Sequence, residues 1–124
     1  MSKITKVIAR QVFDSRGNPT IEAEVFANNM KARAISPSGA STGTHEAYEK
    51  RDKSNKRYLG KSVFKAVKLI NTIISKKLKN QNIHNQEKID YILIKLDGTK
   101  QKKKFGANAL LAVSMAVKKL SARI

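Results

Sequence analysis

A run of small and hydroxyl-bearing residues between Ser36 and Glu46, with the sequence SPSGASTGTHE, is the part of this chain best suited to chemistry. Its two glycines allow backbone N–H groups to turn toward an anion, and its small side chains let a phosphate approach closely. Hydroxyl oxygens are hard ligands of the kind that Mg²⁺ accepts. The composition therefore predicts an exposed loop that is able to contact a phosphate or a metal–phosphate complex.

A plain connection explains the same composition. Segments rich in Ser, Gly and Thr often join a strand to a helix and bind nothing, and composition alone favours this reading. The run also matches neither the dinucleotide fingerprint nor the P-loop, because no Gly-Lys-Ser/Thr follows its first glycine.

The composition narrows the class of protein. A chain of 124 residues with 40% apolar side chains suits one folded domain. The absence of cysteine excludes disulfides and thiolate zinc sites, and leaves His45 and His84 as the imidazole ligands. The N-terminus has no apolar core of signal-peptide length, and the longest uncharged stretch, residues 105–117, is too short to span a bilayer. We expect a soluble, cytoplasmic protein that does not interact with a membrane.

The net charge of +17 is concentrated in the second part of the chain. Residues 1–49 carry six basic and five acidic side chains, whereas residues 50–124 carry twenty basic and four acidic ones. Such a surface can hold nucleic acid or another polyanion. However, Lys outnumbers Arg twenty to six and Asn and Ile are abundant, as codon drift in an A/T-rich genome would produce. The lysines are also spread out and lack interleaved aromatic residues, so we favour drift over a binding function.

The residue pattern predicts an α+β domain in which a three-stranded antiparallel sheet precedes three to four helices. Alternating and β-branched residues predict strands at residues 3–12, 20–27 and 30–35. The sequence DSRGNP at residues 14–19 and the pair Asn28-Asn29 predict the two turns between them.

The second part of the chain has a helical period. A short helix is possible at residues 45–51, and Ser62 is a plausible N-cap for a helix with one apolar face (Val63, Val67, Ile70 and Ile74). Asn85 should cap a helix that buries Ile89, Ile92 and Leu96 and stops at the sequence DGT, residues 97–99. A last helix, rich in small residues, should run from about residue 107 to 122. No capping sequence follows it, so we expect the chain to be cut from a longer one.

Four motifs in a fixed order make the chain recognisable: DSRGNPT (residues 14–20), PSGASTG (37–43), LDGT (96–99) and KFGANA (104–109). They resemble enolase across essentially the whole chain. The resemblance implies that residues 1–124 form the N-terminal capping domain that precedes a (β/α)₈ barrel in that family. The complete enzyme, phosphopyruvate hydratase, is a glycolytic lyase that reversibly dehydrates 2-phosphoglycerate to phosphoenolpyruvate with two Mg²⁺ ions.

The resemblance also assigns roles to individual residues. It implies that the loop closes over the substrate and that Ser41 ligates the second Mg²⁺. It implies that Arg16 lies at the interface of a homodimer and that His45 is a loop residue and not a catalytic base. The complete set of implied substrate-loop residues is Ser38, Gly39, Ala40, Ser41, Thr42 and Gly43.

The departures from the family pattern limit what this chain should do alone. The proton-transfer residues and the carboxylates of the first Mg²⁺ site belong to the barrel, which needs roughly 250 residues and is absent here. We therefore assign no catalytic residue to this chain and expect it to be inactive in isolation. Smaller departures are Ser36, where an apolar residue is usual, and Lys100, where an acidic residue is usual.

Three readings follow from these observations. The first is the N-terminal domain of an enolase, present as a fragment, a truncated product or half of a split enzyme. The second is a basic module that keeps this fold and binds a polyanion or nucleic acid. The third is a truncated product without function.

Overall fold

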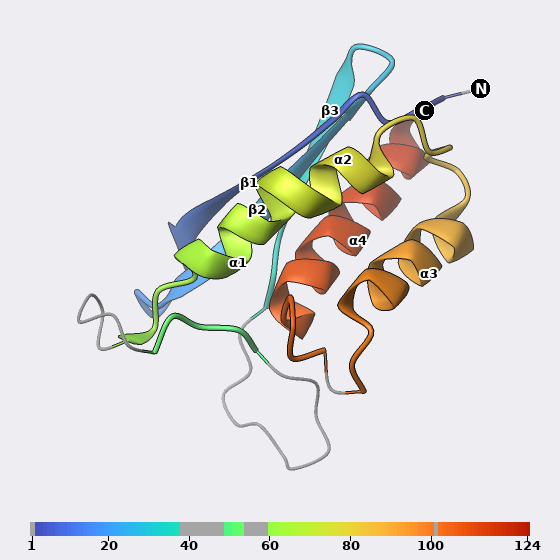
Figure 1. Ribbon diagram of the computed structural model, residues 1–124. Helices are drawn as coiled ribbons and strands as arrows, with labels where there is room; N and C mark the ends of the chain where they lie inside the picture. The colour runs from blue at the N-terminus through green and yellow to red at the C-terminus, as the bar shows by residue number, and fades with distance from the viewer. Residues whose placement is uncertain (1, 38–48, 54–59, 101) are drawn as a thin grey trace.

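The fold is an antiparallel sheet with helices packed on one face. The computed structural model describes residues 2–37, 49–53, 60–100 and 102–124. Figure 1 shows the sheet behind a layer of helices. The sheet consists of β1 (Lys6–Phe13), β2 (Pro19–Ala27) and β3 (Met30–Ile35), and the helical segments are α1 (Phe64–Leu69), η2 (Ile70–Ile74), α2 (Ser75–Leu78), α3 (Gln86–Asp97) and α4 (Ala107–Arg123). This order confirms the α+β prediction.

The sheet has the order β1-β2-β3, and both turns lie where the sequence predicts them. The Asp14 carboxylate shapes the first turn, since it accepts hydrogen bonds from the backbone N–H groups of Arg16 and Asn18, each at 2.9 Å. At the second turn, Asn28 and Asn29 have positive φ angles of 53° and 61°. Asparagine tolerates this left-handed conformation, which is the one that a two-residue hairpin needs.

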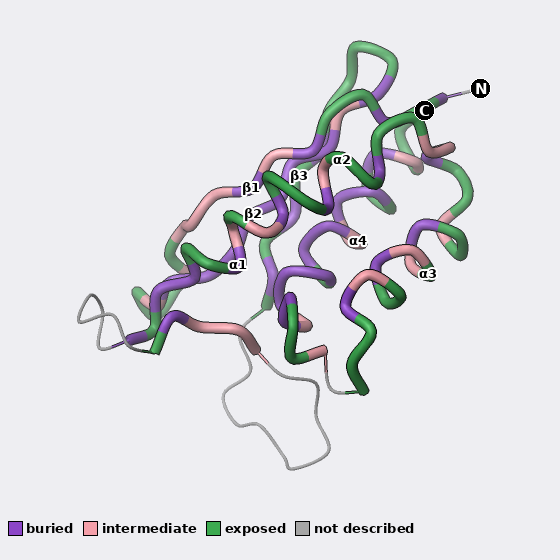
Figure 2. The backbone as a smooth tube through the Cα atoms, viewed as in Figure 1, coloured by how far each residue is buried: buried purple, intermediate pink, exposed green. Residues whose placement is uncertain are grey.

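One face of the sheet forms the core. Alternate residues of β2 (Ile21, Ala23, Val25 and Ala27) have 0% exposure. Helix α4 packs on β2 and β3, and the α1–η2–α2 segment packs on β1. Figure 2 shows the buried residues concentrated between these helices and the sheet. The small residues predicted to allow close packing of the last helix lie in this core, among them Ala109, Ala112 and Ala116.

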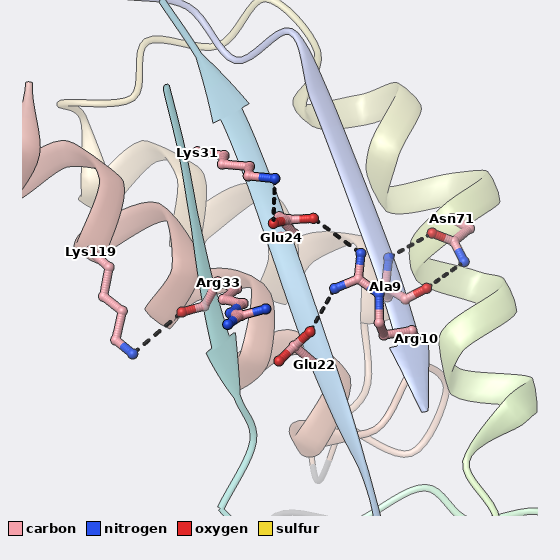
Figure 3. Close-up of polar contacts among 8 residues, drawn as sticks. All are labelled: Ala9, Arg10, Glu22, Glu24, Lys31, Arg33, Asn71 and Lys119. Carbon is pink, nitrogen blue, oxygen red and sulfur yellow. Dashed lines mark hydrogen bonds and ion pairs between the residues drawn. The ribbon is translucent and has the colours of Figure 1, made fainter. Parts of the chain in front are cut away.

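Side chains from the helices cover the backbone at both edges of the sheet. Asn71, in the π-helical segment η2, accepts a hydrogen bond from the Ala9 N–H at 2.8 Å and donates one to the Ala9 carbonyl at 3.0 Å (Figure 3). At the opposite edge, Lys119 donates to the Arg33 carbonyl at 3.3 Å, and Arg123 donates to the Lys31 carbonyl at 3.0 Å. Backbone groups at these edges, which no further strand pairs among the described residues, are therefore partly satisfied by side chains.

Of two predictions about the first helical region, one is only partly tested and the other is wrong. Of the short helix expected at residues 45–51, only residues 49–51 are described, and they are not helical. Ser62 does not cap the next helix, because the Asp52 carboxylate accepts the N–H groups of Phe64 at 3.2 Å and Lys65 at 3.0 Å. A carboxylate complements the positive end of a helix better than a hydroxyl does. The Ser62 hydroxyl is buried and has no hydrogen-bond partner among the described residues.

The third helix begins and ends as predicted. The Asn85 side chain accepts the N–H of Lys88 at 3.2 Å, and Gly98 ends the helix with φ 69°. Its buried face is rotated slightly from the expected one: Ile89 and Leu93 are fully buried, while Ile92 and Leu96 are only partly buried. None of the described helices is long and apolar enough to cross a membrane.

Asp97 organises the turn that leads from α3 to α4. Its carboxylate accepts the backbone N–H groups of Thr99 at 3.0 Å and Phe105 at 2.8 Å, and also the Thr99 hydroxyl. Burial opposes ionisation of Asp97, but the hydrogen bonds from Phe105 and Thr99, with the nearby charge of Lys102, outweigh burial and hold its pKa below the ordinary value of 3.8. The turn is therefore held together by an ionised carboxylate.

We predict that Asp52→Ala lowers the free energy of unfolding by about 1–2 kcal/mol, because two N–H groups at the start of α1 lose their acceptor. Ser62→Ala is the matched control, and it should change stability much less because the Ser62 hydroxyl has no partner to lose. Urea denaturation followed by circular dichroism measures both variants. Equal losses in the two variants would contradict the assignment of Asp52 as the cap.

We predict that Asp97→Asn destabilises the domain at neutral pH and that the difference from the unsubstituted chain narrows in acid. A carboxyl group with a lowered pKa contributes stability above its unfolded value of 3.8, and loses that contribution as the pH falls through its folded pKa. Urea denaturation at several pH values, from neutral to below 3.8, measures the difference. A difference that stays constant over this range would contradict the ionised state of Asp97.

Candidate functional site

The candidate loop lies outside the described residues, but the segments on both sides of it are described. Residues 38–48 include every predicted substrate-loop residue (Ser38, Gly39, Ala40, Ser41, Thr42 and Gly43) and also His45. Nothing in the described structure tests their roles. What the structure does show is how the chain is held at residues 36–37 before the loop and at residues 49–52 after it.

The segment before the loop is tied to the central strand. Ser36 donates its backbone N–H to the Ile21 carbonyl at 2.8 Å, and its own carbonyl accepts the Thr20 hydroxyl at 2.7 Å. Thr20 and Ser36 are both buried. The Ser36 hydroxyl is also buried and has no partner among the described residues. The chain thus enters the loop from a fixed point.

The segment after the loop is held by one side chain from α4. Lys50 donates its backbone N–H to the Asn108 side-chain oxygen at 2.9 Å, and its carbonyl accepts the Asn108 Nδ2–H at 3.0 Å. Asn108 is only 7% exposed. Gly106 makes room for this contact: it has φ 92°, and an added Cβ would lie 2.4 Å from the Lys50 Cβ and from the Asn108 Oδ1. The start of α4 and residue 50 therefore fit closely together.

Arg51 connects the same segment to two other parts of the chain. Its guanidinium donates to the Pro19 carbonyl at 2.8 Å and to the Lys61 carbonyl, and it forms an ion pair with Glu49. Its side chain is 17% exposed. Asp52 is also held by a distant segment. Its backbone N–H donates to the Ser62 carbonyl at 2.8 Å, and its carboxylate caps α1. Three consecutive residues after the loop are therefore fixed by contacts with distant segments.

The predicted interface residue Arg16 lies at the exposed turn between β1 and β2. Its backbone N–H is bonded to Asp14, and its side chain extends into solvent. This placement makes the guanidinium accessible to another molecule. The interface role itself stays a prediction.

A cluster of charged side chains lies on the outer face of the sheet, on which none of the described helices packs (Figure 3). Arg10 forms ion pairs with Glu22 at 2.6 Å and Glu24 at 3.0 Å, and Lys31 lies 3.8 Å from Glu24. The hydrogen bonds that Arg10 donates to Glu22 and Glu24 raise the pKa of Arg10, and the bond that Glu24 accepts from Arg10 lowers the pKa of Glu24 despite its burial. The pairing followed from the strand register, in which Arg10 faces Glu22, and the sequence analysis missed it.

The described residues provide no metal centre of their own. Among them, no group of three or more His, Asp or Glu side chains could hold an ion. The hydroxyl of Ser41 has the right chemistry to be one hard ligand for Mg²⁺, but a six-coordinate ion needs further oxygen ligands. Those ligands would have to come from water, from a bound molecule or from residues other than those described.

Sequence reasoning also missed the residues that fix the two ends of the loop. Asn108 belongs to the KFGANA motif, and the motif alone predicts no role for it, although asparagine is a poor helix former and its presence in the first turn of α4 is a signal. Thr20 and Arg51 gave no comparable signal, because their partners lie 16 and 32 residues away along the chain.

Comparison with known proteins supplies the family. Residues 4–124 match the family described as "Enolase, N-terminal domain". The chain is also 70% identical over all of its 124 residues to the enolase of Pelagibacter ubique (strain HTCC1062), and it spans 30% of the length of that relative. With the match covering nearly every residue, and with the sheet followed by helices in the order that the motifs implied, the chain belongs to the enolase N-terminal domain family.

Proposed function

We propose that this chain is the capping domain of an enolase and that it supplies the substrate loop and one Mg²⁺ ligand for the dehydration of 2-phosphoglycerate to phosphoenolpyruvate. The observation that carries the proposal is the 70% identity to the Pelagibacter ubique enolase over the whole chain. The fixed ends of the 38–48 segment support it, because a segment that must present ligands to a substrate needs defined points of attachment.

In this proposal the residues of the chain bind and orient the substrate and transfer no proton. Ser41 would hold Mg²⁺ through its hydroxyl oxygen, and Gly39 and Gly43 would let the backbone approach a phosphate closely. Bound Mg²⁺ supplies positive charge that stabilises the negative charge developing on the substrate carboxylate. Thr20 and Asn108 keep the two ends of this segment in register with the rest of the domain.

The remaining chemistry belongs to a part of the enzyme beyond these residues. We propose that a C-terminal (β/α)₈ barrel provides the proton-abstracting lysine, the acid glutamate and the first metal site. The proposal also includes a homodimer, with Arg16 at its interface, and a cytoplasmic location, since glycolysis takes place there.

The decisive test compares the isolated chain with the complete enzyme. The complete enzyme is the natural polypeptide that carries these 124 residues together with its own barrel. If the natural polypeptide has no barrel, the complete enzyme is this chain joined to the part of the Pelagibacter ubique enolase beyond the match. We expect the complete enzyme to convert 2-phosphoglycerate in the presence of Mg²⁺ and the isolated chain to be inactive. The ultraviolet absorbance of phosphoenolpyruvate measures both.

Ser41→Ala in the complete enzyme should raise the Mg²⁺ concentration for half-maximal activity by about 10- to 100-fold, because one oxygen ligand is lost. Ser75→Ala is the control, since among the described residues that hydroxyl bonds only to the Asn71 carbonyl, within the α1–η2–α2 segment, at 2.6 Å. An inactive complete enzyme would reject the proposed function. Activity of the isolated chain would contradict only the part of the proposal in which catalysis depends on the barrel.

Polyanion binding is the second candidate, and one observation favours it. Residues 53–86 contain no acidic side chain, and the exposed side of the α1–η2–α2 segment carries several lysines, among them Lys65, Lys68, Lys76 and Lys77. Binding of a short single-stranded RNA, measured by fluorescence anisotropy at several salt concentrations, tests this candidate. We expect only nonspecific affinity, with Kd no lower than about 10⁻⁶ M at physiological salt. A much tighter complex would favour the binding module over the enzyme domain.

A further inference from the structure

We propose that the groove between α3 and α4 is a self-association surface, on which a second copy of this chain packs around a two-fold axis. The inference rests on the described residues of α3, α4 and the turn between them, and it does not depend on the proposed enolase activity. The surface also differs from the proposed Arg16 interface, because Arg16 does not line the groove.

The middle of the groove is apolar. Helices α3 and α4 lie side by side (Figure 1), and the groove between them has a volume of about 330 Å³. Leu93 and Leu110 line it and are almost fully buried, at 2% and 7% exposure. Ile94 and Leu111 line it as well, but they keep 51% and 42% of their surface exposed. Exposed apolar side chains that adjoin one another in this way mark a surface for interaction.

The two ends of the groove carry opposite charges. At one end, the Asp90 carboxylate on α3 accepts a hydrogen bond from the Ser114 hydroxyl on α4 at 2.6 Å. At the other end, Lys102 lies in the turn between the helices, and its ammonium donates to two carbonyls of that turn, each at 3.4 Å. The part of α3 between Asp90 and this turn is about 10 Å long. The apolar middle therefore separates a fixed anion from a fixed cation.

A second copy supplies the complement of each of these features. In a two-fold contact both copies use the same surface, so the surface has to be complementary to itself. With the axis across the middle of the groove, Asp90 of one copy faces Lys102 of the other copy, and this pair occurs twice. Ile94 and Leu111 then lie near the axis and cover each other.

The distribution of charge also favours α3 as the place where two copies meet. The chain has a net charge of +17, so two copies repel each other over much of their surface. Helix α3 differs from the helices around it, because it carries three acidic and two basic side chains, whereas α4 carries three basic ones and none that is acidic. Its acidic residues, Glu87, Asp90 and Asp97, are three of the four in residues 50–124. Repulsion between copies is therefore weakest at this helix.

The contact is small, so we expect a weak dimer with a Kd on the order of 10–100 μM. Sedimentation equilibrium of the 124-residue chain at physiological salt, at concentrations below and above this range, measures it. Ile94→Gln should weaken the dimer at least about tenfold, because the substitution places a polar group near the axis in both copies. Ile73→Gln is the matched control, since Ile73 is also a helical isoleucine, is 41% exposed and lies on η2 outside the groove.

A double-mutant cycle tests the charge pairs. Asp90→Asn removes the negative charge and keeps an oxygen that can accept the Ser114 hydroxyl, and Lys102→Gln removes the positive charge. Each variant should weaken the dimer about 3- to 10-fold, and the double variant should be no weaker than either one, because the same two pairs are lost. Within one chain the two residues lie at opposite ends of the groove, so additive losses would mean that they do not meet across the axis.

A cross-link gives a readout that does not depend on measured affinity. The chain has no cysteine, so Ile94→Cys introduces a single thiol near the expected axis. Under mild oxidation by dissolved oxygen, two copies that meet at this point should form a disulfide-linked dimer on a non-reducing gel. Ile73→Cys is the control, and it should stay mostly monomeric.

Circular dichroism of every variant ensures that association is compared in the folded state. A chain that stays monomeric at all concentrations would overturn the proposal and leave the groove to a different partner. So would equal effects of the Ile94 and Ile73 substitutions, in sedimentation or in cross-linking, or additive losses in the cycle. An isolated chain without a folded structure would also overturn it, because such a chain presents no groove to a second copy.

Discussion

The close packing of α4 against the sheet is the constraint on which the other features depend. The core contains alanines from both sides, Ala23 and Ala34 from the sheet and Ala109, Ala112 and Ala116 from the helix. Side chains that end at Cβ let a helix lie close to a sheet. This proximity allows Asn108 at one end of α4 to reach Lys50, and Lys119 and Arg123 toward the other end to reach the backbone of β3. One packing contact thus fixes the frame of the candidate site.

On the outer face of the sheet the buried side chains are charged and paired, in contrast to the apolar core on the other face. Glu22 and Glu24 are each 8% exposed although no described helix packs on this face, and both form ion pairs with Arg10. Two carboxylates at this degree of burial are tolerated only when they are paired and hydrogen-bonded. The polar outer face also explains why the domain has a core on one side of its sheet and none on the other.

Local interactions were predictable from the sequence, and distant ones were not. The Asn28-Asn29 turn, the Asn85 cap and the stop at Gly98 depend on residues a few positions apart, so the pattern of residue types was sufficient. The cap of α1 was assigned to Ser62 because that residue precedes the helix, whereas the actual cap, Asp52, lies 12 positions before Phe64. Asn108 is 58 positions from its partner. Its importance emerged only when the fold brought the two segments together, while the chemistry of Ser41 was visible in its motif alone.

The side chains at the sheet edges bear on how this domain behaves toward other molecules. A three-stranded sheet has two open edges, and unpaired backbone at such edges can recruit strands from other molecules and begin aggregation. Asn71 forms hydrogen bonds with the Ala9 peptide groups on β1, and Lys119 and Arg123 donate hydrogen bonds to carbonyls of β3. A domain whose sheet edges are partly covered in this way offers fewer open backbone groups to strands of other molecules.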